Sequence, residues 1–341
     1  MSFQPFDEMQ KAVDIVNDSP HPVNKVAATI FGFDRQGRDF SISRTNYWPE
    51  IIEARLGMHT DVGDSSGTVH AETACILDAP LTDKTALCVT DPVCPNCAKN
   101  IAEAGIKTIY IDHKGFTKDF SARRGDAFTN MSMQICEKAG ISVYQIFRKE
   151  QRLEPILRID ADYHPAQDSP LEYERLYGVI TRKSFAEYVE KMRHRHRGRR
   201  FACAIGRDRV SGNVFSLAAR SHPVIGYSMA TDAPLLRDSE NKYNYMLEPI
   251  NRLIMGAARI GVKLIDGMIF CTNIPTSREQ VNLIGGGVTR LYVEYANKAL
   301  DEAAILAKRT VTTARILDFQ DLDELQALIN PVQPHEKSTD T

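Results

Sequence analysis

The feature that most constrains the fold of this 341-residue chain is an internal repeat. Residues 25–46 align with residues 200–221 without a gap, and residues 90–111 align in the same way with residues 272–293. A match of this length within one chain indicates a single supersecondary arrangement that occurs twice. The sequence therefore predicts two domains of one fold.

The aligned segments also predict which elements each domain contains. Residues 25–46 and 200–221 each have an apolar stretch, a polar turn with glycine and a β-prone stretch, as in a β-hairpin. Residues 90–111 and 272–293 read as a helix that ends at glycine, followed by a buried strand. Helical spacing of apolar residues precedes both hairpins, at Met9, Ala12, Val13 and Val16 and at Phe185, Tyr188, Val189 and Met192. The predicted order in each α/β domain is helix, hairpin, helix, strand, helix, strand, helix.

We expect a first domain over residues 1–150, a linker over 151–180, a second domain over 181–325 and a disordered tail over 326–341. The linker prediction rests on the polar, proline-containing stretch at residues 160–171. A formal net charge of −2 argues against binding nucleic acid through bulk charge, although a local basic groove stays compatible with it.

Further features bear on the compartment. No apolar run is long enough to span a bilayer, so no membrane partner is expected. The start of the chain lacks the charged and apolar regions of a secretory signal. Seven cysteines form an odd, sparse set that is not typical of a disulfide framework. We therefore expect a cytoplasmic protein.

Two short strings carry chemistry: His70-Ala71-Glu72, and Cys94-Pro95-Asn96-Cys97. One His with a close Cys pair is a ligand set that Zn²⁺ favours, and three protein ligands leave a fourth position for water. Zinc would lower the pKa of that water and so supply hydroxide near neutral pH. Glu72, which is not a ligand, is the predicted proton shuttle. We expect one Zn²⁺ per chain; a structural zinc or a redox cysteine pair is the alternative.

The combined pattern is close to the His-x-Glu and Pro-Cys-x-x-Cys signature of zinc deaminases. It departs at one place, because Val93 precedes Cys94 and the proline lies one position earlier, at Pro92. HAETACILDAP and CPNCAKNIAEAGIKTIYID resemble the cytidine and deoxycytidylate deaminase superfamily over most of residues 1–148. This resemblance implies a three-layer α-β-α fold with a central mixed sheet, here present twice.

The resemblance also implies substrate-binding residues in the first domain. Asn46, in an Asn-x-x-Pro setting, corresponds to the family's sugar contact, and the backbone of Ala71 to its base contact. Trp48 is a candidate for stacking on the base, and Arg123 for holding a 5′-phosphate. The alternatives are a turn-forming Asn46, a Trp48 that covers a core edge, and a solvated Arg123.

The second repeat lacks the zinc ligands. The ungapped offsets place Met246 opposite His70, Glu248 opposite Glu72, Thr276 opposite Cys94, Glu279 opposite Cys97 and Ser221 opposite Asn46. Met and Thr are not a zinc set, so we expect no catalytic zinc there. Thr276 and Glu279 instead have the spacing of a capping box, which predicts a helix start held without metal. The second domain is therefore interpreted as a pseudo-deaminase.

The leading hypothesis is a hydrolytic deaminase of the cytosine of a free nucleotide or nucleoside, most simply (d)CMP. A second hypothesis is a deaminase of tRNA or another polynucleotide, held through the basic run from Arg193 to Arg200. The alternative interpretation of that run, a solvated helix C-terminus, is the one that most runs of charge favour. A third is a zinc-stabilised binding or regulatory protein without turnover. Both a monomer and a homo-oligomer fit the sequence.

Overall fold

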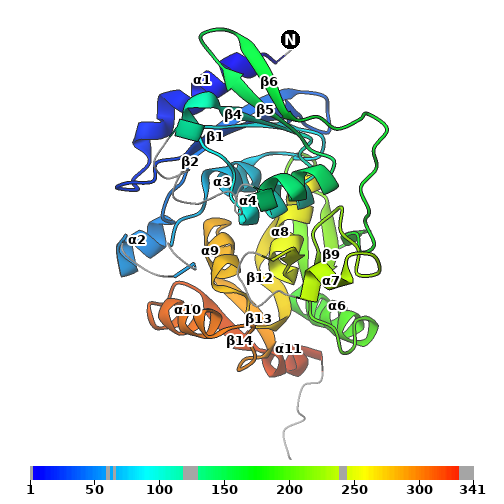
Figure 1. Cartoon of the computed structure of the whole chain (residues 1–341). Coiled ribbons are helices and arrows are strands. Elements are labelled where there is room, and N and C mark those ends of the chain that lie inside the picture. The colour runs from blue at the N-terminus through cyan, green and yellow to red at the C-terminus, as the bar shows by residue number, and fades with distance from the viewer. Residues whose placement is uncertain (1–2, 59–61, 64–66, 118–129, 238–243, 330–341) are drawn as a thin grey trace, which may run out of the picture.

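The computed structural model describes residues 3–58, 62–63, 67–117, 130–237 and 244–329 (Figure 1). Two six-stranded mixed sheets form its framework. The predicted α/β fold with a central mixed sheet, present twice, is confirmed by the strand order and direction described below. Among the described helices, none combines the length and apolar character that crossing a bilayer requires.

The first sheet has the strand order β2-β1-β3-β4-β5-β6. Strands β3, β4 and β5 run parallel to one another, and the remaining neighbours pair antiparallel. The strands are β1 (Ala27–Phe33), β2 (Asp39–Thr45), β3 (Ala86–Val89), β4 (Thr108–Asp112), β5 (Ser142–Phe147) and β6 (Arg152–Leu157). The predicted hairpin is thus β1 and β2, at one end of the sheet.

The second sheet, in the order β7-β9-β8-β12-β13-β14, repeats five strands of this plan, but its sixth strand β7 lies at the hairpin edge, opposite to the edge that β6 occupies. Strand β8 takes the place of β1, and β9, β12, β13 and β14 follow as β2, β3, β4 and β5, with the same pairing directions. The strands are β7 (Glu172–Leu176), β8 (Phe201–Asp208), β9 (Val214–Arg220), β12 (Val262–Asn273), β13 (Arg290–Tyr295) and β14 (Asp318–Asp321). A small ladder joins β10 (His222–Pro223) to β11 (Met246–Leu247).

Helices cover both faces of each sheet and so make three layers (Figure 1). In the first repeat, α1 (Pro5–Ile15) packs on one face, and α3 (Ala71–Asp78), α4 (Pro95–Glu103) and a helix at residues 130–138 lie on the other. In the second, α6 (Arg182–Arg195) and α11 (Leu322–Ile329) cover one face, and α8 (Pro249–Arg259), α9 (Ser277–Gly285) and α10 (Glu302–Thr313) the other. Shorter helices are α2 (Glu50–Leu56), α7 (Ala233–Arg237) and the 3₁₀ turns Val16–Asp18 and His113–Thr117.

The alternation of side chains along β1 explains the layers. Ala27 and Phe31 face α1, where they pack with Met9 and Ala12, whereas Ala28 and Ile30 face the opposite core. Successive strand residues point to opposite sides, so a strand that is buried along most of its length needs cover on both faces. The apolar stripe predicted for α1 supplies that cover on one side.

The largest apolar cluster belongs to both repeats at once. Helices α3 and α4 of the first repeat contact α8 of the second, and α3 also contacts α9 (Figure 1). At this interface Arg252 of α8, which is 1% exposed, meets Glu103 of α4 at 3.1 Å. The two repeats therefore share one core between their sheets, while the other face of each sheet has a smaller cluster of its own.

The domain boundaries differ from those expected. Strands β6 and β7 both fall within the predicted linker 151–180, which leaves residues 158–171 as the connection. Both are edge strands with mostly exposed side chains, so they lack the apolar pattern that would predict them. Strands β5 and β14, which follow the last predicted helix of each repeat, were also missed. Helix α11 runs to Ile329, into the predicted tail, and residues 330–341 lie outside the described residues.

Candidate metal centre and catalytic site

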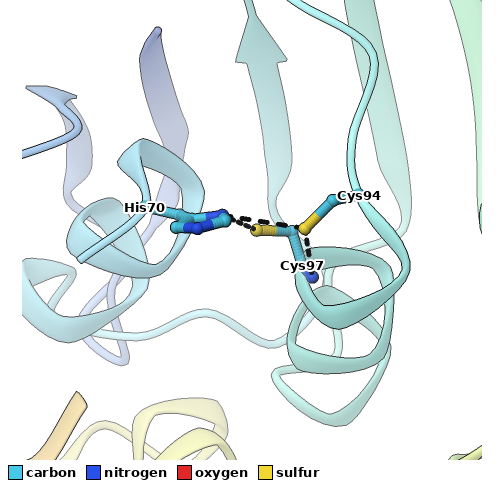
Figure 2. A group of neighbouring side chains, drawn as sticks. All are labelled: His70, Cys94 and Cys97. Carbon is cyan, nitrogen blue, oxygen red and sulfur yellow. Dashed lines mark hydrogen bonds between the residues drawn. The ribbon is translucent and has the colours of Figure 1, made fainter. Parts of the chain in front are cut away.

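The three predicted zinc ligands meet at two helix starts of the first repeat (Figure 2). His70 is the N-cap of α3, Cys94 is the N-cap of α4, and Cys97 lies in the first turn of α4. The His70 Nδ1 atom is 3.2 Å from the Cys97 sulfur and 3.6 Å from the Cys94 sulfur. Residues separated by 27 positions in the chain thus converge on one point.

The local sequence favours the thiolate form of Cys94. Pro95 occupies the first position of α4, where its missing N–H costs nothing, and the Cys97 backbone N–H donates to the Cys94 sulfur at 3.4 Å. A hydrogen bond from the Cys97 thiol and the positive charge of His70 hold the pKa of Cys94 well below its usual value. A thiolate is the form that binds zinc.

The donor set fits zinc. One imidazole nitrogen and two sulfurs, all within 4.8 Å of one another, leave room for an ion with bonds of about 2.0–2.3 Å and for a fourth ligand. Within the described part of the chain, no other cluster of three or more His, Cys, Asp or Glu side chains could hold a metal.

Glu72 lies beside this cluster, in the first turn of α3, and is 4% exposed. Burial raises the pKa of its carboxyl, and the positive charge of His70 opposes part of that effect. It stands outside the three-ligand group, yet its carboxyl is close enough to interact with both cysteines and His70. A carboxylate in this position can take up and release a proton next to a metal-bound ligand.

The structure buries both Asn46 and Ala71, and Ala71 directly follows the candidate ligand His70. Asn46 is 6% exposed, and its side-chain oxygen accepts hydrogen bonds from the Val26 backbone N–H at 2.9 Å and the Ser19 hydroxyl at 2.8 Å. Its amide nitrogen donates to the Asn24 carbonyl at 2.9 Å. Asn46 therefore holds its loop, and the sugar contact stays a prediction for its second amide hydrogen. Ala71 is the first residue of α3, fully buried.

Trp48 is 4% exposed, and its ring stacks on His21 with centroids 5.4 Å apart and planes 15° from parallel. This burial favours the role of covering a core edge, while stacking on a base stays a prediction. His21 is the residue that the sequence did not reveal. Its Nδ1 accepts the backbone N–H of Asn24 at 2.8 Å, which leaves the ring proton on Nε2. Burial, and then the nearby charge of His70, lower its pKa, so it lies close to the metal ligands.

Arg123, the predicted phosphate contact, lies outside the described residues. An arginine of the second repeat, Arg278, contacts the segment that precedes His70. Arg278, 9% exposed at the start of α9, donates to the carbonyl of Thr68 at 2.6 Å and to that of Gly63. Thr68 stands two residues before His70, so the second repeat holds the segment that presents the first ligand.

The structure of the second repeat corrects the ungapped alignment of the segment before α8. Leu247 pairs with His222 as Val69 pairs with Tyr47, and Glu248 is the N-cap of α8 as His70 is the N-cap of α3. Glu248 therefore stands opposite His70, not opposite Glu72. With Ser221 opposite Asn46, the segment before α8 is three residues longer than its counterpart before α3, and the residue opposite His70 lies two positions beyond Met246. Thr276 does occupy the Cys94 position, as the N-cap of α9.

At these helix starts of the second repeat, carboxylates stand where the first repeat has its candidate metal ligands. Glu279, in the Cys97 position, completes the predicted capping box by accepting the Thr276 backbone N–H at 2.8 Å. Its other oxygen accepts the Asn251 backbone N–H of α8 at 3.0 Å. One side chain thus joins the two helix starts that zinc would join in the first repeat. Glu248 is held separately, by Ser221 at 3.0 Å and Arg200 at 3.2 Å.

This replacement makes stability depend on pH. Burial and the neighbouring Glu248 carboxyl raise the pKa of Glu279 from 4.5 to about 7. Because the pKa of Glu279 is higher in the folded than in the unfolded protein, its stabilising contribution is complete below pH 4.5 and is lost as pH rises through 7.

Relative to Glu279→Gln, we expect the wild type to lose at most about 3 kcal/mol of unfolding free energy over this pH range. Urea unfolding at several pH values measures it, with the half-exposed Glu190→Gln as control. Equal pH slopes in wild type and Glu279→Gln would contradict the assignment.

No protein-family model and no curated protein matches the chain. Among solved structures, the chain is similar to the dCMP deaminase of cyanophage S-TIM5 in complex with dCMP and dUMP, at 21% identity and a TM-score of 0.28. This match covers 41% of this chain and 94% of that one. The apo form of that protein matches at the same identity and TM-score, over 43% of this chain and 100% of that one. Each match covers less than half of this chain.

Proposed function

We propose that the chain is a zinc-dependent hydrolytic deaminase of a nucleobase, with one zinc in the first repeat. The observation that carries this proposal is the convergence of His70, Cys94 and Cys97 with the buried Glu72 beside them. A purely structural zinc needs no adjacent acid, so the presence of Glu72 favours an enzyme over a zinc-stabilised binding protein.

The residues of this chain then have defined roles. His70, Cys94 and Cys97 would hold zinc, which when bound lowers the pKa of a water in its fourth position. Glu72 would take one proton of the attacking water at its carboxylate and deliver it to the ring nitrogen. It would then carry the proton of the hydroxyl added at C4 to the amine, so that ammonia departs as the C4 carbonyl forms. The buried surroundings of Glu72 keep bulk water away from this transfer.

We propose the cytosine of a free (deoxy)cytidine nucleotide as substrate, because the strings around the ligands resemble the deoxycytidylate deaminase branch most closely. Asn46 and the Ala71 backbone are the proposed contacts to sugar and base, while Trp48 and Arg123 are further candidates.

The polynucleotide alternative depends on the basic run, and the structure shows most of that run engaged. Arg193 pairs with Glu190 and Glu294, Arg195 with Glu172, and Arg200 with Glu248. Paired guanidinium groups have less charge to offer phosphates, so the free nucleotide is the favoured substrate.

One experiment tests the proposal. Purified full-length protein should hold about one zinc per chain, measured by elemental analysis, because only one ligand set is expected. Mass spectrometry on dCMP, CMP, cytidine, guanine and total tRNA should show deamination, first of all of dCMP. Cys94→Ser should lose the zinc, whereas Cys136→Ser, which changes a buried thiol outside the site, should keep it. A zinc-loaded chain that deaminates none of these substrates would refute the proposal.

A further inference from the structure

We propose that a second pocket, in the C-terminal repeat, binds the phosphate of a nucleotide. The pocket has a volume of about 610 Å³ and lies beside Ser221, His222 and Met246, next to the β10–β11 ladder. A cavity of this size is in the range of ligand sites for small molecules.

The pocket corresponds in position to the region beside the metal centre of the first repeat. The Ser221 backbone N–H donates to the Arg200 carbonyl at 3.0 Å, as the Asn46 N–H donates to the Val26 carbonyl at 3.0 Å. His222 pairs across its ladder as Tyr47 does. The second repeat thus keeps the place of the substrate pocket although it has lost the metal ligands.

The charge of this pocket differs from that of its counterpart. Arg200 stands where the first repeat has Val26, and Arg220 stands where it has Thr45, according to the backbone hydrogen bonds and strand pairing. Arg199 also lines the pocket. Two guanidinium groups therefore occupy positions that are uncharged in the first repeat.

The guanidinium groups of Arg199 and Arg220 have N–H donors that a ligand in the pocket can use. The Arg199 side chain is exposed and has no side-chain partner among the residues that the structure describes. Arg220 donates from Nη2 to the Ser169 hydroxyl at 3.0 Å, which leaves further donors on its guanidinium. The acidic groups nearby are Asp168 in the pocket lining and Glu248, which is already bound to Arg200.

Three guanidinium groups against two carboxylates make the pocket a site for an anion, and guanidinium geometry suits phosphate. The phosphate assignment stands on this pocket alone. That the phosphate belongs to a nucleotide rests on the proposed function, since the corresponding pocket of the first repeat is the proposed nucleotide site. The alternative source of a phosphate group at this pocket is a polynucleotide that lies across the loop at residues 196–200.

A neighbouring cavity of about 630 Å³ provides the matched control. It shares Arg199 and Arg200 with the first pocket and is also lined by Arg197, which does not line the first pocket. Replacing Arg197 thus removes the same charge a short distance away, without touching the proposed site.

The test is calorimetric titration of zinc-loaded, full-length protein with inorganic pyrophosphate, thymidine monophosphate and a single-stranded DNA oligonucleotide. The first two cannot lose ammonia, so turnover does not interfere. We expect the double variant Arg199→Glu, Arg220→Gln to bind both small probes about tenfold more weakly or worse, and Arg197→Glu to bind them as the wild type does. Circular dichroism confirms that each variant is folded.

Unchanged pyrophosphate affinity in the double variant, or no pyrophosphate binding to the wild type, overturns the proposal. An Arg197→Glu variant that loses as much affinity, with the oligonucleotide as the tightest ligand, overturns it in favour of a polynucleotide. Deamination of dCMP measured on the same preparation keeps the two proposals apart. A chain that binds pyrophosphate here but deaminates nothing contradicts only the proposed function.

Discussion

Replacing Glu72 with alanine is expected to lower the turnover of dCMP by a factor of about 10³–10⁴ and to leave one zinc per chain in place. The factor is the upper part of the range for a lost general acid and base. Zinc stays because Glu72 is not among the three ligands, whose atoms lie within 4.8 Å of one another. Stopped assays with mass spectrometry give the rate, and elemental analysis gives the metal content.

The isosteric variant Glu72→Gln separates proton transfer from packing. It keeps the shape of a side chain that is 4% exposed, so a comparable loss of rate in both variants assigns the effect to the carboxylate. A Glu72→Ala protein that retains near wild-type turnover would rule out Glu72 as the proton shuttle.

The second large effect concerns stability, at the interface of the two repeats. Replacing Arg252 with methionine is expected to lower the free energy of unfolding by about 3–5 kcal/mol. Arg252 and Glu103 are 1% and 2% exposed, and the variant leaves the Glu103 carboxylate buried without its ion pair. One Glu103 oxygen already has no partner in the described part of the chain, so the remaining charge has little compensation. Chemical unfolding followed by circular dichroism measures the change.

Two controls make this prediction specific. Arg259 and Asp83 form another ion pair between the repeats, at 3.0 Å, but both side chains are about 30% exposed. Arg259→Ala should therefore cost less than about 1 kcal/mol. The double variant Arg252→Met, Glu103→Met should recover most of the loss, since it removes both buried charges together. Equal destabilisation by Arg252→Met and Arg259→Ala would show that burial of the pair is not the cause.

Strong local signals in the sequence were enough to predict the cluster of His70, Cys94 and Cys97 and the doubled fold. His70, Cys94 and Pro95 each mark a helix start, and the structure begins α3 and α4 there. The glycine-containing turns and apolar strands predicted both hairpins, because burial on two faces leaves a plain apolar pattern.

Features set by tertiary contacts were not predictable in this way. Strands β6 and β7 expose most of their side chains, so pairing with a neighbour, and not composition, makes them strands. The two-residue shift that brings Glu248 opposite His70 becomes evident only from the β10–β11 ladder and the helix start. His21 lies near the ligands because a loop folds over Trp48, and an isolated histidine carries no pattern that would indicate this.

The hydrogen bonds from Arg278 to the segment before His70 have a consequence for how the protein behaves on dilution. Where a separate subunit supplies such a support, the contact is lost once the protein concentration falls below the dissociation constant. Here both partners belong to one polypeptide, so their effective concentration is set by the chain and does not change. The segment before His70 is therefore held equally well in a very dilute and in a concentrated solution of the protein.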